Sequence, residues 1–239
     1  GYDFIADTAV SNDGNGRDAD ARDPGDWCSS SSSWHGTHVA GTIAAVTNNG
    51  LGVAGVAPSA RIVPVRVLGR CGGYISDVAA GVVWASGGTV SGIPANAYPA
   101  RVLNLSLGGS GACGTTMQNA INSARSRSAM LVIAAGNSNI NASNASPANC
   151  AGVITVGATT RTGARASFSN YGSVVDVAAP GAGILSTLNA GSTVPGADSY
   201  ASYDGTSMAT PHVAGVAALM LAKNAALTPD QVESMLKSS

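Results

Sequence analysis

Residues 205–215, GTSMATPHVAG, pass from small, turn-forming residues into the apolar run of residues 216–222, VAALMLA. This composition predicts a loop that delivers Ser207 to the first turn of a buried helix. Pro211 suits such a first turn, because the N–H groups there have no intrahelical partner to lose. A helix N-terminus also favours an anion, such as the oxyanion formed in acyl transfer. On this stretch alone, Ser207 is equally well interpreted as a nucleophile or as a simple helix cap.

The composition of the chain indicates a globular protein without a charged binding face. Its 239 residues suit one large α/β domain or two small ones, and 45% of them are hydrophobic, enough to build a core. Only 10% are charged and the net charge is −1, so we expect no nucleic-acid partner and no anionic membrane surface. No apolar run reaches the roughly 20 residues that span a bilayer, so we expect no membrane partner of that kind either.

Apolar runs alternate with helical patterns from Trp34 to the end of the chain. The expected helices are 37–46, 75–85, 115–127 and one that begins near Pro229; the expected strands are 61–68, 102–106, 130–134, 153–157 and 174–178. Strands of this buried kind that alternate with helices predict an α/β fold, with a mostly parallel sheet covered by helices on both faces. No repeat or linker divides the chain, so we expect residues 1–239 to form a single domain.

The first 26 residues contain seven aspartates in a Gly- and Asn-rich loop. Closely spaced carboxylates and carbonyls on such a backbone are the ligands that a hard cation such as Ca²⁺ requires. We therefore predict a structural calcium site, whose candidate ligands are Asp13, Asp18, Asp20, Asp23 and Asp26. The alternative is a solvated acidic loop that is partly neutralised by Arg17 and Arg22.

The chain has four cysteines, Cys28, Cys71, Cys113 and Cys150. None belongs to a Cys-x-x-Cys pair, which argues against a structural zinc site. An even number of well-separated cysteines favours disulfides and an extracellular setting. Spacing leaves all three pairings open.

Two further segments carry polar groups that could serve a site with Ser207. Residues 34–41, WHGTHVAG, place His35 at the start of a predicted helix, and residues 132–138, VIAAGNS, place Asn137 directly after an apolar strand. A side-chain amide there can donate a hydrogen bond beyond the carboxyl end of the sheet, where open α/β sheets bind ligands.

These segments resemble the motifs of the subtilisin-like serine proteases, the subtilases. Residues 34–41 look like the histidine motif of that family, residues 134–137 like its oxyanion segment, and residues 205–215 like its serine motif. The three occur in the family's order, and the resemblance covers essentially the whole chain. The acidic N-terminal loop and the cysteines look like those of secreted bacterial members. The resemblance implies a three-layer fold with right-handed crossovers and a serine endopeptidase.

The resemblance also implies a role for each site residue. Ser207 would be the nucleophile, His35 the general base and later acid, and Asn137 would bind the oxyanion together with the Ser207 N–H. The pocket walls implied by the resemblance are Ser106, Leu107, Gly108, Ala134, Ala135 and Gly136. Their small and apolar side chains suggest broad preference for large apolar residues in protein or peptide substrates. His38 and His212 are expected to be structural.

Further expectations follow from the same resemblance. It pairs Cys28 with Cys71 and Cys113 with Cys150, each closing a loop of about 40 residues. It implies a monomer that is secreted and that is made with its own pro-segment.

The chain departs from the family at the third member of the triad. That member is an aspartate at the end of an apolar strand, followed by Thr or Ser and then Gly. Asp7 is followed by Thr8 but not by glycine, and no full strand precedes it. Residues 1–5, GYDFI, resemble the segment after that strand, so we expect the aspartate to lie upstream and the last helix to be cut.

Two other functions remain open on these residues. A subtilase fragment without its aspartate would be a catalytically impaired enzyme, or a pseudoenzyme that only binds peptides. An α/β-hydrolase is disfavoured, because its catalytic histidine lies well beyond the serine, whereas here only His212 follows Ser207.

Overall fold

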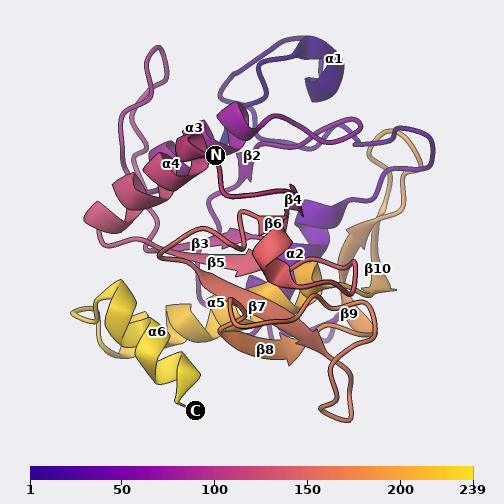
Figure 1. The fold of residues 1–239 in the computed structure, drawn as a ribbon. Helices are drawn as coiled ribbons and strands as arrows, with labels where there is room; N and C mark the ends of the chain where they lie inside the picture. The colour runs from indigo at the N-terminus through magenta and orange to yellow at the C-terminus, as the bar shows by residue number, and fades with distance from the viewer. Residues whose placement is uncertain (239) are drawn as a thin grey trace.

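The computed structural model describes residues 1–238; Ser239, which the predicted domain includes, lies outside the described residues. A parallel sheet in the strand order β3-β5-β7-β8 forms the centre of the fold (Figure 1). Its strands are β3 (Val102–Leu105), β5 (Met130–Ala134), β7 (Ile154–Thr159) and β8 (Val177–Pro180). Every residue of β5 is buried, which explains why its sequence is an unbroken apolar run.

Helices cover both faces of this sheet, as predicted. On one face, α3 (Ile75–Ala85) and α4 (Thr115–Ser126) pack on a core that includes Leu131 and Ile133. On the other face, α5 (Thr206–Lys223) packs on a second core that includes Met130 and Val132, and α2 (His35–Ala44) packs against α5. Successive residues of β5 thus enter opposite cores, which fixes the three-layer arrangement.

The remaining strands form three small two-stranded sheets. β1 (Tyr2–Asp3) pairs in parallel with β2 (Val65–Arg66), and β4 (Gly109–Ser110) pairs antiparallel with β6 (Ala145–Ser146). β9 (Ile184–Asn189) and β10 (Asp198–Tyr203) form an antiparallel hairpin. The other short elements are α1 (Thr8–Ser11), the 3-10 turn η1 (Ala142–Asn144) and α6 (Pro229–Lys237).

Several element boundaries differ from the sequence prediction. The strand expected at 61–68 is only Val65–Arg66, because Pro64 has no N–H for the ladder and the partner β1 has two residues. The strand expected at 174–178 begins at Val177, and the helix expected at 37–46 begins two residues earlier at His35. The β9–β10 hairpin was not predicted.

The position of Pro211 also differs from the prediction. α5 begins at Thr206, so Pro211 lies inside the helix and not in its first turn. Its missing N–H would have bonded the carbonyl of Ser207, four residues earlier. That carbonyl instead accepts a hydrogen bond from the Ser106 hydroxyl at 2.8 Å, so the proline leaves no unpaired oxygen there.

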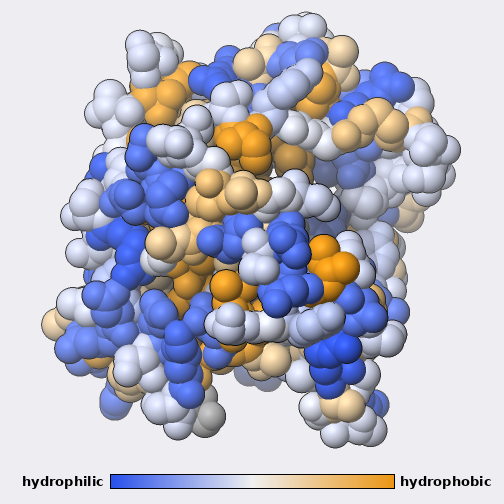
Figure 2. All heavy atoms as spheres, viewed as in Figure 1, coloured by the Kyte–Doolittle hydropathy of each residue, from blue (hydrophilic) through white to orange (hydrophobic). Residues whose placement is uncertain are grey.

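Two disulfides link loop segments that are distant in the sequence. Cys28–Cys71 joins the acidic loop to the segment after β2, and Cys113–Cys150 joins the N-terminal side of α4 to the segment before β7. Both pairings are those implied by the family resemblance. Within residues 1–238, no helix combines the length and the hydrophobicity needed to cross a membrane. On the face shown in Figure 2, hydrophilic residues surround separate apolar patches.

Candidate active site

Ser207 is the second residue of α5, at the carboxyl end of the parallel sheet. Its Oγ donates to the carbonyl of Ser106, just after β3, at 3.2 Å, and the Ser106 hydroxyl donates back to the Ser207 carbonyl. The Ser207 N–H lies in the first helical turn and has no hydrogen-bond partner within the described residues. The serine is therefore held at a strand end, with a backbone donor free beside it.

Asn137 follows β5 and is oriented by Thr206. Its Oδ1 accepts from the Thr206 N–H at 2.8 Å and from the Thr206 hydroxyl at 2.9 Å. Both contacts hold the carbonyl side of the amide, so the Nδ2 side remains for another acceptor. Within residues 1–238 this Nδ2 donates to no group. The Asn137 Nδ2 and the Ser207 N–H thus form a pair of free donors, whose nitrogens lie 3.4 and 3.5 Å from the point that a Cβ on Gly205 would occupy. Two donors that lie close to one point are the arrangement needed to bind an oxyanion.

His35 is the first residue of α2, and the residue before it anchors the start of the helix. Trp34 has a left-handed φ of 49°, and its indole N–H donates to the Gly191 carbonyl at 2.7 Å. Burial lowers the pKa of His35 below its usual 6.5, and His38 lowers it further, whereas the charge of Asp26 acts in the opposite direction. A lowered pKa keeps the imidazole neutral near pH 7, the form in which it accepts a proton.

No carboxylate orients His35 in the part of the chain that the structure describes. Asp7, the superficial match to the triad acid, is the N-cap of α1: its Oδ1 accepts from the Ala9 N–H, and its Oδ2 accepts from the Tyr74 hydroxyl at 3.4 Å. The imidazole of His35 makes no hydrogen bond to any residue between 1 and 238, Ser207 included. The described residues thus include the predicted base and the predicted nucleophile, but no carboxylate that fixes the orientation of His35.

The other two histidines have structural contacts. The Nε2 of His38 lies 3.0 Å from the carbonyls of both Ile184 and Ala201, one on each strand of the β9–β10 hairpin. Its ring stacks on that of Tyr203, with 4.6 Å between the centroids. His212 lies on α5, with Nδ1 2.8 Å from the Met208 carbonyl.

The predicted pocket walls lie at one edge of the sheet. Ser106, Leu107 and Gly108 follow β3, and Ala134, Ala135 and Gly136 end or follow β5, its hydrogen-bonded neighbour. Parallel strands end at the same edge, so both segments lie on the side where Ser207 contacts Ser106. The Gly136 N–H donates to the Thr206 hydroxyl at 3.1 Å, which joins one wall to the serine segment.

Sequence reasoning missed two residues of this region, Thr206 and Asn170. Thr206 is adjacent to Ser207, so its position in the serine motif was the available signal. Asn170 is 3% exposed and bonds the segment that contains Asn137, although it lies more than thirty residues later in the chain. Nothing in the local sequence around Asn170 indicates this contact.

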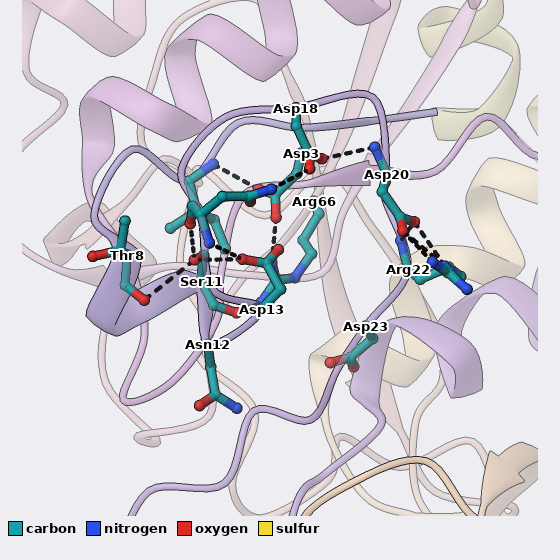
Figure 3. Close-up of polar contacts among 12 residues, drawn as sticks. Asp3, Thr8, Ser11, Asn12, Asp13, Asp18, Asp20, Arg22, Asp23 and Arg66 are labelled. Carbon is teal, nitrogen blue, oxygen red and sulfur yellow. Dashed lines mark hydrogen bonds and ion pairs between the residues drawn. The ribbon is translucent and has the colours of Figure 1, made fainter.

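The acidic loop does not gather the predicted calcium ligands into one cluster; Figure 3 shows Asp13, Asp18, Asp20 and Asp23. No group of three or more His, Cys, Asp or Glu side chains suited to a metal occurs among the described residues. Asp13 pairs with Arg66 at 3.1 Å, Asp18 accepts from Asn15, and Asp20 is held by Arg22, whose hydrogen bonds lower the pKa of Asp20 to about 2. Asp26 accepts from the backbone and hydroxyl of Ser33.

Asp23 differs from these four aspartates in that its side chain accepts a single hydrogen bond within residues 1–238. Its Oδ1 accepts from the Gly25 N–H at 2.8 Å, and it forms no ion pair within residues 1–238. Burial raises its pKa, and the nearby charge of Asp26 raises it further. Together with Asp13 and Asp20, Asp23 lines an open cavity of about 710 Å³, which residues 193–195 also line but His35 and Ser207 do not.

Comparison with known proteins places the whole chain in one family. Residues 4–239 match the model of the subtilase family. An extracellular protease of Xanthomonas campestris pv. campestris is 62% identical over 250 residues, which cover 100% of this chain and 43% of that protein. An extracellular basic protease of Dichelobacter nodosus is 50% identical over 254 residues, which cover 99% of this chain and 42% of that protein. The chain therefore spans less than half the length of these curated relatives.

Solved structures agree with this result. A protease from Pseudoalteromonas arctica matches with a TM-score of 0.98 and 59% identity, covering 100% of this chain and 76% of that one. A cold-adapted subtilisin-like serine proteinase matches with a TM-score of 0.73 and 40% identity, covering 100% of this chain and 72% of that one. By its sequence and by its fold, the chain belongs to the subtilase family.

Proposed function

We propose that the protein containing this chain is a serine endopeptidase that hydrolyses peptide bonds of proteins, with Ser207 as nucleophile and His35 as general base. The observation that carries the proposal is the pair of free donors, Asn137 Nδ2 and the Ser207 N–H, which lie 3.4 and 3.5 Å from one point beside Gly205. A helix-capping serine would need no such pair, whereas an acyl-transfer site requires donors aimed at a developing oxyanion.

The chemistry follows from these groups. Ser207 Oγ exchanges its contact with the Ser106 carbonyl for the scissile carbonyl carbon, and His35 takes its proton. The resulting oxyanion accepts hydrogen bonds from Asn137 and from the Ser207 N–H. Collapse breaks the C–N bond, and the amine leaves with the proton from His35. Water then attacks the ester, gives its proton to His35, and the second collapse releases the acid and restores the Ser207 hydroxyl.

The substrate would bind between the two wall segments. Residues 106–108 and 134–136 present backbone at the end of adjacent strands, where an extended peptide can pair with them. The walls carry small or apolar side chains, which favours large apolar residues before the scissile bond. The full-length protein should therefore cleave peptides with such residues faster than peptides with charged ones at that position.

The acid that orients His35 would come from a strand upstream of Gly1. β3 is the terminal strand of the central sheet, and β2 belongs to a different sheet, so the edge of β3 has no strand partner among residues 1–238. Asn104 in β3 carries a buried Oδ1 that no described group bonds. An added strand beside β3 would pair this edge, and an aspartate at its carboxyl end would lie at the same edge as Ser207.

The main alternative is a pseudoenzyme that binds peptides without cleaving them. Labelling of the full-length protein with a fluorophosphonate separates the two, because this reagent reacts with an activated serine. We expect labelling and casein hydrolysis that Ser207→Ala abolishes. A full-length protein that binds peptide but neither labels nor cleaves casein would support the pseudoenzyme.

Calcium remains a proposal, and Asp23 is the residue that best fits it. A partly buried carboxylate near a second carboxylate, Asp26, that forms no ion pair within residues 1–238 suits a hard cation. Asp13 and Asp20 already pair with arginines and suit it less. We expect chelation to lower Tm, since a cation present at 100 times its Kd stabilises the native state by about 2.7 kcal/mol. Asp23→Asn should remove this response; an unchanged Tm on chelation would refute the site.

We also propose that the protein is secreted, acts as a monomer and is made with a pro-segment. The two disulfides and the extracellular relatives support secretion, since disulfides persist in oxidising compartments. Fractionation of the producing cells and the mass of the purified protein test these points.

A further inference from the structure

Asn170 lies under the loop that follows β5 and bonds it at several points. Its Nδ2 donates to the Ala135 carbonyl at 2.8 Å, and its Oδ1 accepts from the N–H groups of Ser138 and Ile140 at 3.0 and 3.1 Å. Its own backbone N–H donates to the Gly136 carbonyl at 2.9 Å. One buried residue thus bonds the loop both before and after position 137.

The side-chain amide of Asn170 also packs closely against Gly136. Gly136 has a φ of +102°, and a Cβ at that position would lie 2.4 Å from Asn170 Nδ2. The amide therefore packs directly on the turn that glycine permits. A shorter side chain would not reach the loop, and aspartate would place an oxygen against the Ala135 carbonyl where a donor is needed.

We propose that Asn170 is a positioning residue for the oxyanion donor, because it fixes the backbone that carries Asn137. Thr206 orients the side chain of Asn137, and Asn170 holds the peptide groups around it. Preorganised donors contribute most to stabilisation of an oxyanion, and a displacement of about 1 Å can cost about a hundredfold in rate. This inference rests on the proposed endopeptidase function and assigns to the same site a residue that does not touch the substrate.

The test compares Asn170→Ala with a matched control in the full-length protein. Asn96 makes a similar set of three bonds far from the site: Nδ2 lies 3.3 and 3.2 Å from the carbonyls of Trp84 and Ala85, and Oδ1 accepts from the Tyr98 N–H. Asn96→Ala therefore removes comparable loop contacts. We expect kcat on a peptide amide to fall about 10- to 100-fold in Asn170→Ala and to stay within twofold in Asn96→Ala.

A second readout separates positioning from a general loss of structure. A peptide boronic acid forms a tetrahedral adduct with the serine and uses the oxyanion donors, whereas a product peptide does not. In Asn170→Ala the affinity for the boronic acid should fall in parallel with kcat, and the affinity for the product peptide should change less than threefold. Combined with Asn137→Leu, Asn170→Ala should cause no further loss of kcat.

Three outcomes would overturn the inference: kcat of Asn170→Ala within twofold of wild type, equal losses of affinity for both ligands, or an additive loss in the double variant. Asn170→Asp, close in shape, gives the same comparison should Asn170→Ala fail to fold. A wild-type protein that neither cleaves the peptide nor reacts with a fluorophosphonate would instead overturn the proposed function itself.

Discussion

Replacement of Thr206 by valine tests how much the orientation of the Asn137 amide contributes to the reaction. The Thr206 hydroxyl is fully buried and bonds two groups, donating to Asn137 Oδ1 at 2.9 Å and accepting from the Gly136 N–H at 3.1 Å. Valine has the same shape but bonds neither. The Thr206 N–H still holds Asn137 Oδ1 at 2.8 Å, so the amide loses one of its two restraints.

The magnitude follows from these two contacts. One neutral hydrogen bond contributes about 0.5–1.5 kcal/mol net. Since each 1.36 kcal/mol is a factor of ten in rate, its loss in the transition state should lower kcat about 2- to 13-fold. Complete loss of an oxyanion donor costs about 10²–10³ in kcat, a figure measured in subtilisin itself and taken over here for Asn137→Leu. The unpaired Gly136 N–H should also lower stability by about 1–3 kcal/mol.

The assay is kcat and KM of the full-length protein on a chromogenic peptide, together with Tm. Thr206→Ser keeps the hydroxyl and should recover most of kcat. In the Asn137→Leu background, Thr206→Val should not lower kcat further, because there is no amide left to orient. An unchanged kcat in Thr206→Val, or the same loss with and without Asn137, would refute the reasoning.

Three further predictions concern the base, a disulfide and a glycine. Protonation of His35 should make kcat/KM fall at acidic pH, and burial, which lowers the pKa of His35, shifts this fall to lower pH. Replacing the proposed upstream aspartate by asparagine removes an anion beside the imidazole and should move this acidic limb to still lower pH; an unmoved limb would count against an upstream acid. Replacing Cys113 and Cys150 by serine opens a loop with a sequence separation of 37 and should lower the free energy of unfolding by about 4 kcal/mol in urea titrations. Gly136→Ala should lower kcat and Tm together, since its φ is +102° and the new Cβ would displace Asn170; full activity would show that the loop tolerates movement.

The sequence predicted the central layers because their signals are local. The run at residues 130–134 is apolar on both faces of its strand, and residues 75–85 have a helical apolar stripe, so both were placed at their observed bounds. The β9–β10 hairpin carries no comparable pattern: every residue of β10 is half-buried or exposed, and most of them are polar. Its position depends on contacts with α2, such as that of His38 with Ala201, which only the folded chain brings together.

The candidate site could be predicted from sequence where short motifs contain its residues, but not where residues distant in the sequence contact one another. His35, Asn137 and Ser207 follow from three short segments. Asn170 could not be found, because its partners lie in a loop some thirty residues earlier and amide–backbone bonds leave no spacing rule. The candidate calcium ligands were predicted from composition, yet Arg66 and Arg22 pair with Asp13 and Asp20 and occupy carboxylate oxygens there.

The position of Pro211 connects the helix to the site in a way that helix propensity does not explain. A proline inside a helix costs about 3 kcal/mol and leaves the carbonyl four residues earlier without its bond. Here that carbonyl belongs to Ser207 and accepts from Ser106, while Ser207 Oγ donates to the Ser106 carbonyl. These two hydrogen bonds between Ser106 and Ser207 join the first turn of α5 to the end of β3. The hydrogen bonds of Thr206 with Gly136 and Asn137 join the same turn to the loop after β5. Ser207 is therefore held by two strand ends, which restricts its backbone while its hydroxyl stays free to exchange one acceptor for another.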